Sequence, residues 1–330
     1  MKGPKPIVEI TATGRYLPDN IVTNADMEKL VDTSDEWIRQ RTGIRERRMA
    51  PKGINAAYMG TEAAKIAMCR AGVQSGEIDL LVCATATPDR LLPATACDIQ
   101  ALLGAKNAAA FDISAACSGF IYALTVAEGH IAAGRGEIAL IVSTEKMTGI
   151  VDWTDRSTFV LFGDGAGAAI VKRAENGRGV LSTFIRSDGT LAELLWRPGG
   201  GLIEPFDIGM VDSKAHLVKM AGSEVFKAAV RSMAEAADQA LIRAGLTSDD
   251  IDLLIPHQAN IRIIEATAKY AKIPMDKVFV NVDRYGNMSS ATVPIALDEA
   301  IESGRVKRGD NILMVAFGAG FTWASSVIRW

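Results

Sequence analysis

The chain has 330 residues, 48% of them hydrophobic, so it can form one large domain or two of ordinary size around a substantial core. Its 36 Lys and Arg against 39 Asp and Glu leave a formal net charge of −3, which gives the whole molecule no attraction to nucleic acid or to a membrane surface. The four cysteines have the spacing of neither a zinc site nor a disulfide framework, so we expect free thiols and no metal.

The first residues, MKGPKPIVEITATG, lack the apolar core of a signal peptide. No apolar run approaches the ~20 residues that a membrane-spanning helix needs. The sequence therefore predicts a cytoplasmic protein.

Apolar, β-rich runs alternate with alanine-rich helical segments along most of the chain. In chain order the pattern predicts a strand over residues 78–84, a helix over 94–103, a strand over 108–113, a helix over 118–133 and a strand over 138–142. This alternation predicts an α/β fold with buried, largely parallel sheets.

Part of the sequence is repeated. The segment AGV at residues 71–73, followed by IDLLV at 78–82, recurs as AGL at 244–246, followed by IDLLI at 251–255. Shorter matches, GRGE with RGD and FG with FG, follow in the same order. We therefore expect a duplicated unit, with halves 1–175 and 176–330 that meet at the polar turn Glu175-Asn176-Gly177.

Cys117 lies between the predicted strand at 108–113 and the helical segment that begins at residue 118. The positive end of a helix dipole lowers the pKa of a thiol from about 8.5 to roughly 3.5–7.5. The alternative is a small buried core cysteine. The strand-to-helix turn favours a nucleophile.

His257 and Asn287 are candidate partners of this thiol. His257 directly follows the second copy of the repeated strand, and strand ends are where open α/β sheets place chemistry. Asn287, in YGNMSS, is equally consistent with a helix cap and with a donor to a reacting oxygen. In a duplicated fold the three residues can share one site.

Two glycine-rich segments predict different functions. GDGAGA at 163–168 fits a loose dinucleotide-binding pattern, but the strand-like AIVK follows where a helix is needed, so we expect no nicotinamide or flavin. FGAGF at 317–321 lies between two β-like runs, and its N–H groups are candidate oxyanion donors.

Basic residues suggest two contact surfaces. Five arginines, at positions 39, 41, 45, 47 and 48, follow Trp37, and they fit either a solvated face or a nucleotide with phosphates. Arg262 and Lys269 share one helical face, which can receive an acidic partner.

Together these residues place the chain close to a known family. The segments SDEWIRQRTGIRERR, FDISAACSGF, DRSTFVLFGDGAGAA, IPHQANIRI, DRYGNMSSATVP and AFGAGFTW occur in the family order and spacing. The chain resembles the β-ketoacyl-[acyl-carrier-protein] synthase III family, the initiating condensing enzymes of bacterial fatty-acid synthesis, nearly end to end. The resemblance implies a thiolase-like, five-layered αβαβα fold and a homodimer.

The resemblance also implies a mechanism. Cys117 would take an acyl group, typically acetyl, from acyl-coenzyme A, and malonyl-[acyl-carrier protein] would then lose carbon dioxide while His257 and Asn287 donate to its thioester oxygen. Backbone N–H groups of Cys117 and Ala319 would hold the tetrahedral oxyanion, and Phe317 would shield the malonyl side. No cofactor or metal is implied beyond the two substrates.

Further contacts follow from the same resemblance. The implied coenzyme A contacts are Trp37, Arg41, Arg156 and Asn260, and the implied carrier-protein contacts are Lys227, Arg262 and Lys269. Leu92, at a position implied to line the partner subunit's acyl pocket, is smaller than the aromatic residue of some relatives and leaves primer length open. Ala319 replaces a glycine of many relatives, which raises a question about backbone geometry there.

Three alternatives remain at this stage. A papain-like cysteine hydrolase fits the order of Cys, His and Asn but lacks the local cysteine signature and does not explain the repeat. A priming synthase of specialised metabolism or a C–O-bond-forming acyltransferase would share the cysteine chemistry. A carrier-protein-binding module without catalysis requires an unreactive Cys117.

Overall fold

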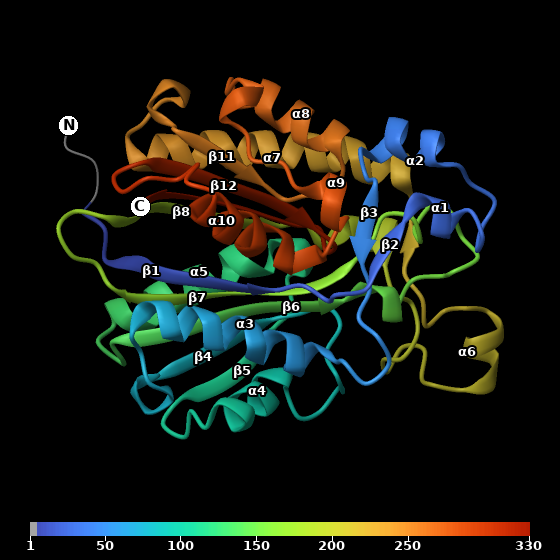
Figure 1. The fold of residues 1–330 in the computed structure, drawn as a ribbon, viewed down its shortest axis with the longest axis horizontal. Helices are drawn as coiled ribbons and strands as arrows, with labels where there is room; N and C mark the ends of the chain where they lie inside the picture. The colour runs from blue at the N-terminus through green and yellow to red at the C-terminus, as the bar shows by residue number, and fades with distance from the viewer. Residues whose placement is uncertain (1–4) are drawn as a thin grey trace.

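Two β-sheets lie at the centre of the computed structural model, which describes residues 5–330 (Figure 1). The first sheet has the order β1-β7-β6-β4-β5 and consists of β1 (Val8–Tyr16), β4 (Leu80–Ala84), β5 (Ala109–Ile113), β6 (Ile138–Lys146) and β7 (Asp164–Arg173). The second has the order β11-β12-β13-β8 and consists of β8 (Gly179–Ser187), β11 (Leu253–Pro256), β12 (Asn311–Gly318) and β13 (Thr322–Arg329). Two short ribbons pair β2 (Ile21–Thr23) with β3 (Glu46–Arg48), and β9 (Leu195–Trp196) with β10 (Lys219–Met220).

Helices form the layers outside and between the two sheets (Figure 1). The first sheet is covered by α3 (Ala56–Ala71) and α4 (Thr95–Leu103), and the second by α7 (Gly222–Ala244) and α8 (Ile261–Tyr270). Between them lie α5 (Gly119–Ala132) and α10 (Thr292–Glu302). The shorter helices are α1 (Asn24–Met27), α2 (Asp35–Thr42), α6 (Ile208–Asp212) and α9 (Val282–Tyr285). The predicted αβαβα layering is confirmed.

The strand directions correct one expectation. β4 is parallel to β5 and β6, and β11 is parallel to β12, but β1–β7, β6–β7, β12–β13 and β13–β8 are antiparallel. The sheets are therefore mixed, and the prediction of largely parallel sheets is wrong. Parallel neighbours need a crossover such as α5, whereas residues 319–321 alone return β12 to β13 and so force an antiparallel pair.

The two copies of the sequence repeat adopt the same local structure. α3 ends at Gly72, with φ 63°, and α7 ends at Gly245, with φ 67°; both caps are left-handed, a conformation that glycine adopts without strain. A short 3₁₀ helix follows each cap, and then β4 or β11 begins.

The central helix α5 sets the position of the site. Seven of its residues are buried, among them Phe120, Leu124 and Ile131, because it packs against strands of both sheets. It begins two residues after Cys117, on the segment that follows β5. Within residues 5–330 no helix is long and apolar enough to span a membrane.

Candidate active site

A cavity of about 640 Å³ brings the predicted site residues from both halves of the chain together. Its buried part includes Cys117, His257, Asn287 and Phe317, whose exposed fractions are all below a tenth. Its more exposed wall includes the predicted contacts Trp37, Arg41, Lys227, Asn260 and Arg262.

Cys117 lies in the 3₁₀ helix η2 (Ala116–Ser118), immediately before α5. Ala116 has φ 44°, a left-handed conformation that non-glycine residues rarely adopt. Gly318 of β12 packs directly on this turn, since a Cβ there would lie 2.5 Å from the Cys117 nitrogen. The close approach of the two segments therefore requires glycine at 318.

The expected low pKa of the nucleophile is wrong for the free protein. Burial raises the pKa of the Cys117 thiol to about 12. The hydrogen bond between Sγ and the Ser289 hydroxyl, at 3.5 Å, and the one to the Cys117 backbone oppose this shift without cancelling it. The helix end was expected to dominate, but desolvation outweighs it because the side chain is buried without a cation beside it in the part of the chain that is described. The free thiol is therefore protonated at neutral pH.

His257 follows β11 directly, and its backbone N–H donates to the Val315 carbonyl at 2.7 Å. Burial lowers the pKa of the ring to about 3, so it is neutral at physiological pH. The Nδ1 atom lies 2.6 Å from the Thr292 hydroxyl. A neutral, tightly held imidazole is suited to donating or accepting one proton, not to pairing with a charge.

Asn287 is held across the two halves by backbone bonds. Its N–H donates to the Leu161 carbonyl at 2.8 Å, and its own carbonyl accepts from the Gly163 N–H at 3.0 Å. The side-chain Oδ1 accepts from the Ser289 N–H at 2.8 Å. The Oδ1 atom therefore closes a turn onto Ser289, while the N-cap residue of the following 3₁₀ helix is Met288, so Asn287 is not the helix cap that one interpretation expected. This bond leaves the amide N–H₂ as the donor end.

The backbone after β12 resolves the question raised by Ala319. Among the described residues, the non-glycine positions with positive φ are Ala116, Asn176, Lys214, Lys272 and Ser289, so Ala319 has an ordinary conformation. The unusual angle falls on Gly320, with φ 140°. Phe317 packs on Phe321, with ring centroids 4.7 Å apart.

Trp37 lies between two guanidinium groups near the exposed end of the cavity. The Cζ atoms of Arg41 and Arg156 are each 5.1 Å from its ring centroid, the geometry of a cation–π contact. Asn260 lines the cavity and also caps α8 by accepting from the Ile263 N–H at 3.0 Å.

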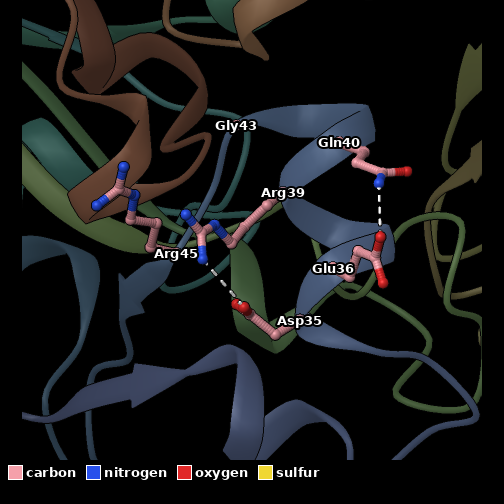
Figure 2. Close-up of a pocket in the computed structure, with 6 residues that line it drawn as sticks. All are labelled: Asp35, Glu36, Arg39, Gln40, Gly43 and Arg45. Carbon is pink, nitrogen blue, oxygen red and sulfur yellow. Dashed lines mark hydrogen bonds and ion pairs between the residues drawn. The ribbon is translucent and has the colours of Figure 1, made fainter.

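The remaining arginines of the segment have different environments. Arg47 is fully buried and donates to the Val160 carbonyl at 2.8 Å, and burial lowers its pKa to about 10. Figure 2 shows a second hollow of about 420 Å³ beside α2, where Arg39 pairs with Asp35 at 3.3 Å. That hollow holds ordinary intrahelical pairs and no nucleophile, so it is a solvated face.

Three of the predicted contact residues do not line the cavity. Arg156 contacts Trp37 but is not part of the lining, Lys269 lies on α8 seven residues after Arg262, and Leu92 is 86% exposed on the loop before α4. Metal-ligand clusters of three or more His, Cys, Asp or Glu are not present in residues 5–330. All four cysteines are free thiols.

Sequence reasoning missed the residues that support the site from behind. Glu145 is fully buried at the end of β6 and accepts from the hydroxyls of Ser290 and Thr87, each at 2.7 Å. It thereby holds the 3₁₀ helix η7 (Ser289–Ala291), which contacts Cys117, Asn287 and, through Thr292, His257. The available signal was a carboxylate in the polar end, STEK, of a strand that begins with the apolar run IALIV.

Comparisons with known proteins agree with this geometry. Residues 111–189 match the family model for 3-oxoacyl-[acyl-carrier-protein] synthase III, and residues 241–330 match the model for its C-terminal part. The beta-ketoacyl-[acyl-carrier-protein] synthase III of Caldanaerobacter subterraneus subsp. tengcongensis is 52% identical over 321 residues, 97% of each chain.

Solved structures give the same result. The crystal structure of 3-oxoacyl-[acyl-carrier-protein] synthase III from Aquifex aeolicus is 49% identical, with a TM-score of 0.92 over 98% of this chain and 100% of that one. The priming beta-ketosynthase of the R1128 polyketide pathway is 37% identical, with a TM-score of 0.91 over 99% of this chain and 97% of that one.

Proposed function

Because the chain belongs to the beta-ketoacyl-[acyl-carrier-protein] synthase III family, we propose that it condenses an acyl-coenzyme A primer, typically acetyl-coenzyme A, with malonyl-[acyl-carrier protein]. The products are a 3-oxoacyl-[acyl-carrier protein], coenzyme A and carbon dioxide. The observation that carries the proposal is the shared cavity of Cys117, His257 and Asn287, which come from both halves of the chain.

In the first half-reaction Cys117 Sγ attacks the thioester carbonyl of the primer. The acyl group moves to sulfur, and the thiol proton leaves with the coenzyme A thiolate, so that charge balances. Because burial holds the pKa of the free thiol at about 12, the proton has to move as the thioester binds. The Ser289 hydroxyl at 3.5 Å and the start of α5 both stabilise the developing negative charge.

In the second half-reaction malonyl-[acyl-carrier protein] enters the same cavity and loses carbon dioxide. His257 and Asn287 donate to the thioester oxygen on which enolate charge develops. The resulting carbanion attacks the acyl-cysteine, and the N–H groups of Cys117 and Ala319 hold the tetrahedral oxyanion. Phe317, buried against Phe321, shields the malonyl side. No metal or cofactor takes part.

Coenzyme A and the carrier protein approach from the exposed end of the cavity. We assign the coenzyme A head group to Trp37, Arg41 and Arg156, with Asn260 beside the pantetheine arm. The carrier protein, an acidic partner, is assigned to the following cations: Lys227, Arg262 and Lys269. The first two line the cavity, which supports an arm that reaches inward from a docked protein.

A homodimer belongs to the same proposal. β5 forms the outer edge of the first sheet, with Phe111 39% exposed, and Leu91 and Leu92 of the preceding loop are more than four-fifths exposed. The unpaired backbone groups of such an edge strand can pair with a second copy of the chain. Leu92 would then enter the partner subunit's acyl pocket, where its small side chain leaves room for longer or branched primers. The division into halves 1–175 and 176–330 and the cytoplasmic location stay predictions.

Intact-protein mass tests the proposal and its alternatives. The protein is mixed with acetyl-coenzyme A or a longer or branched donor, and malonyl-[acyl-carrier protein] is then added. The expected result is an adduct on Cys117 that malonyl carrier protein discharges into a 3-oxoacyl product. Loss of the adduct to water would indicate a hydrolase, transfer without decarboxylation another acyltransferase, and no adduct with any donor a binding module.

A further inference from the structure

The side-chain hydroxyl of Thr292 lies between two possible acceptors. Its Oγ1 atom is 2.6 Å from His257 Nδ1 and 3.1 Å from the Ser289 carbonyl oxygen. Thr292 and Ser289 are buried, and His257 is 3% exposed, so water does not compete for these atoms. A hydroxyl has one proton and can donate to only one of the two acceptors.

The Ser289 carbonyl does not need that proton. It already accepts from the backbone N–H of Thr292, which closes the 3₁₀ helix η7. His257 Nδ1, by contrast, has the Thr292 hydroxyl as its partner within residues 5–330. The shorter distance and the unfilled acceptor both favour donation from Thr292 to His257.

The direction of this bond fixes the tautomer of the ring. A neutral imidazole carries one N–H, so a ring that accepts at Nδ1 holds its proton on Nε2. In the opposite arrangement Nδ1 would donate to Oγ1, Oγ1 would donate to the Ser289 carbonyl, and Nε2 would carry a lone pair. The first arrangement gives the cavity a donor and the second gives it a base.

We propose that Thr292 is a positioning residue that donates to His257 Nδ1 and thereby holds the His257 proton on Nε2, where it donates to the malonyl thioester oxygen. This inference rests on the condensation proposed above. It parallels the way Asn287 is held: the Ser289 N–H bonds to Oδ1 at 2.8 Å and leaves the amide N–H₂ as donor. The segment 289–292 thus orients both side chains as donors.

Two variants separate the hydroxyl from the shape of the side chain. Thr292→Val keeps the β-branch and the backbone N–H but removes the O–H, and Thr292→Ser keeps the O–H as a matched control. Losing one well-aligned donor costs about 10²–10³ in rate, and a valine still lets the ring sample the Nε2–H form, so we expect Thr292→Val to lower kcat for condensation roughly 10- to 100-fold. Acylation of Cys117 and the KM for acyl-coenzyme A should stay near wild type, and Thr292→Ser should restore condensation.

A direct measurement needs no variant at position 292. ¹⁵N NMR of protein labelled at its three histidines, with His257 assigned by comparison with His257→Asn, reports which ring nitrogen carries the proton. The expected signal is Nε2–H in the free wild-type protein. A proton on Nδ1, or a Thr292→Val variant that condenses as well as Thr292→Ser, would overturn the inference. A wild-type protein that does not condense malonyl carrier protein would refute the proposed function instead, and the NMR result would stand apart from it.

Discussion

Replacing Asn287 with alanine is the sharpest test of the proposal that Cys117 takes the acyl group and Asn287 donates only during condensation. The change removes the N–H₂ donor and also the Oδ1 atom that accepts from the Ser289 N–H at 2.8 Å. One donor aimed at developing oxyanion charge contributes about 2.7–4 kcal/mol, so condensation should fall roughly 10²- to 10³-fold. Loss of this turn bond should cost about 1 kcal/mol of folding free energy, which does not unfold a typical domain.

The two half-reactions distinguish the donor role of Asn287 from its turn bond to Ser289. Acylation of Cys117 by acetyl-coenzyme A, followed by intact mass, should keep most of its wild-type rate because the role proposed for Asn287 begins only after malonyl carrier protein binds. Asn287→Asp is the matched control, since its carboxylate can still accept from the Ser289 N–H but has no N–H₂ to give. The aspartate should lose at least as much condensation as the alanine, because its charge opposes the enolate.

Normal condensation by Asn287→Ala would refute the reasoning and leave Asn287 with only the structural role of its turn bond to Ser289. Recovery of condensation in Asn287→Asp would also refute the reasoning, because catalysis would then need the Oδ1 acceptor atom and not the N–H₂ donor. Equal losses of acylation and condensation would instead point to a displaced Cys117.

Four further outcomes are expected. Trp37→Ala should raise the KM for acyl-coenzyme A roughly tenfold through lost stacking and cation–π contact, measured against an unchanged KM for malonyl carrier protein. Arg262→Glu should raise the KM for the carrier-protein substrate more than the KM for acyl-coenzyme A. Lys269 lies outside the cavity, so Lys269→Glu should raise the KM for the carrier-protein substrate and leave the rate of Cys117 acylation unchanged. Equal effects on both substrates would refute the docking assignment. Phe111→Asp on the exposed edge strand should yield monomers in sedimentation velocity, whereas an unchanged dimer would move the interface elsewhere. Burial lowers the pKa of His257 from 6.5 to about 3, so the neutral ring contributes stability that is complete above about pH 6.5 and is lost as the pH falls towards 3. The loss is up to about 1.4 kcal/mol per pH unit. In urea unfolding, the free energy of unfolding of His257→Gln should therefore fall less steeply with decreasing pH than that of the wild type.

The sequence predicted most of the fold and the three side chains that meet in the cavity, Cys117, His257 and Asn287, because both leave local signals. The repeated AGV/IDLLV pattern predicted two equivalent helix-to-strand units, and the helices end at Gly72 and Gly245 with nearly the same backbone angles. Strand direction was predicted less well, since apolar runs look alike whether a neighbour is parallel or antiparallel. The three-residue return from β12 to β13 was the local clue.

Burial and hydrogen-bond direction could not be predicted from the sequence. The helix start beside Cys117 was visible and suggested a low pKa, but the desolvation that raises the pKa depends on packing by residues from distant segments, such as Gly318 and Ser289. Glu145 belongs to no recognisable sequence motif, because its partners Thr87 and Ser290 are far from it along the chain.

The Glu145 carboxylate also has a consequence for how the molecule comes apart. Its bonds tie β6 and residues 86–87 of the first half to η7 of the second, directly beneath the cavity. A partial opening that separated the halves would break these bonds, expose the Glu145 carboxyl group and at the same time move Cys117, His257 and Asn287 apart. The shared cavity and the cohesion of the two halves therefore depend on one junction, so a half-opened molecule would not keep the three side chains together.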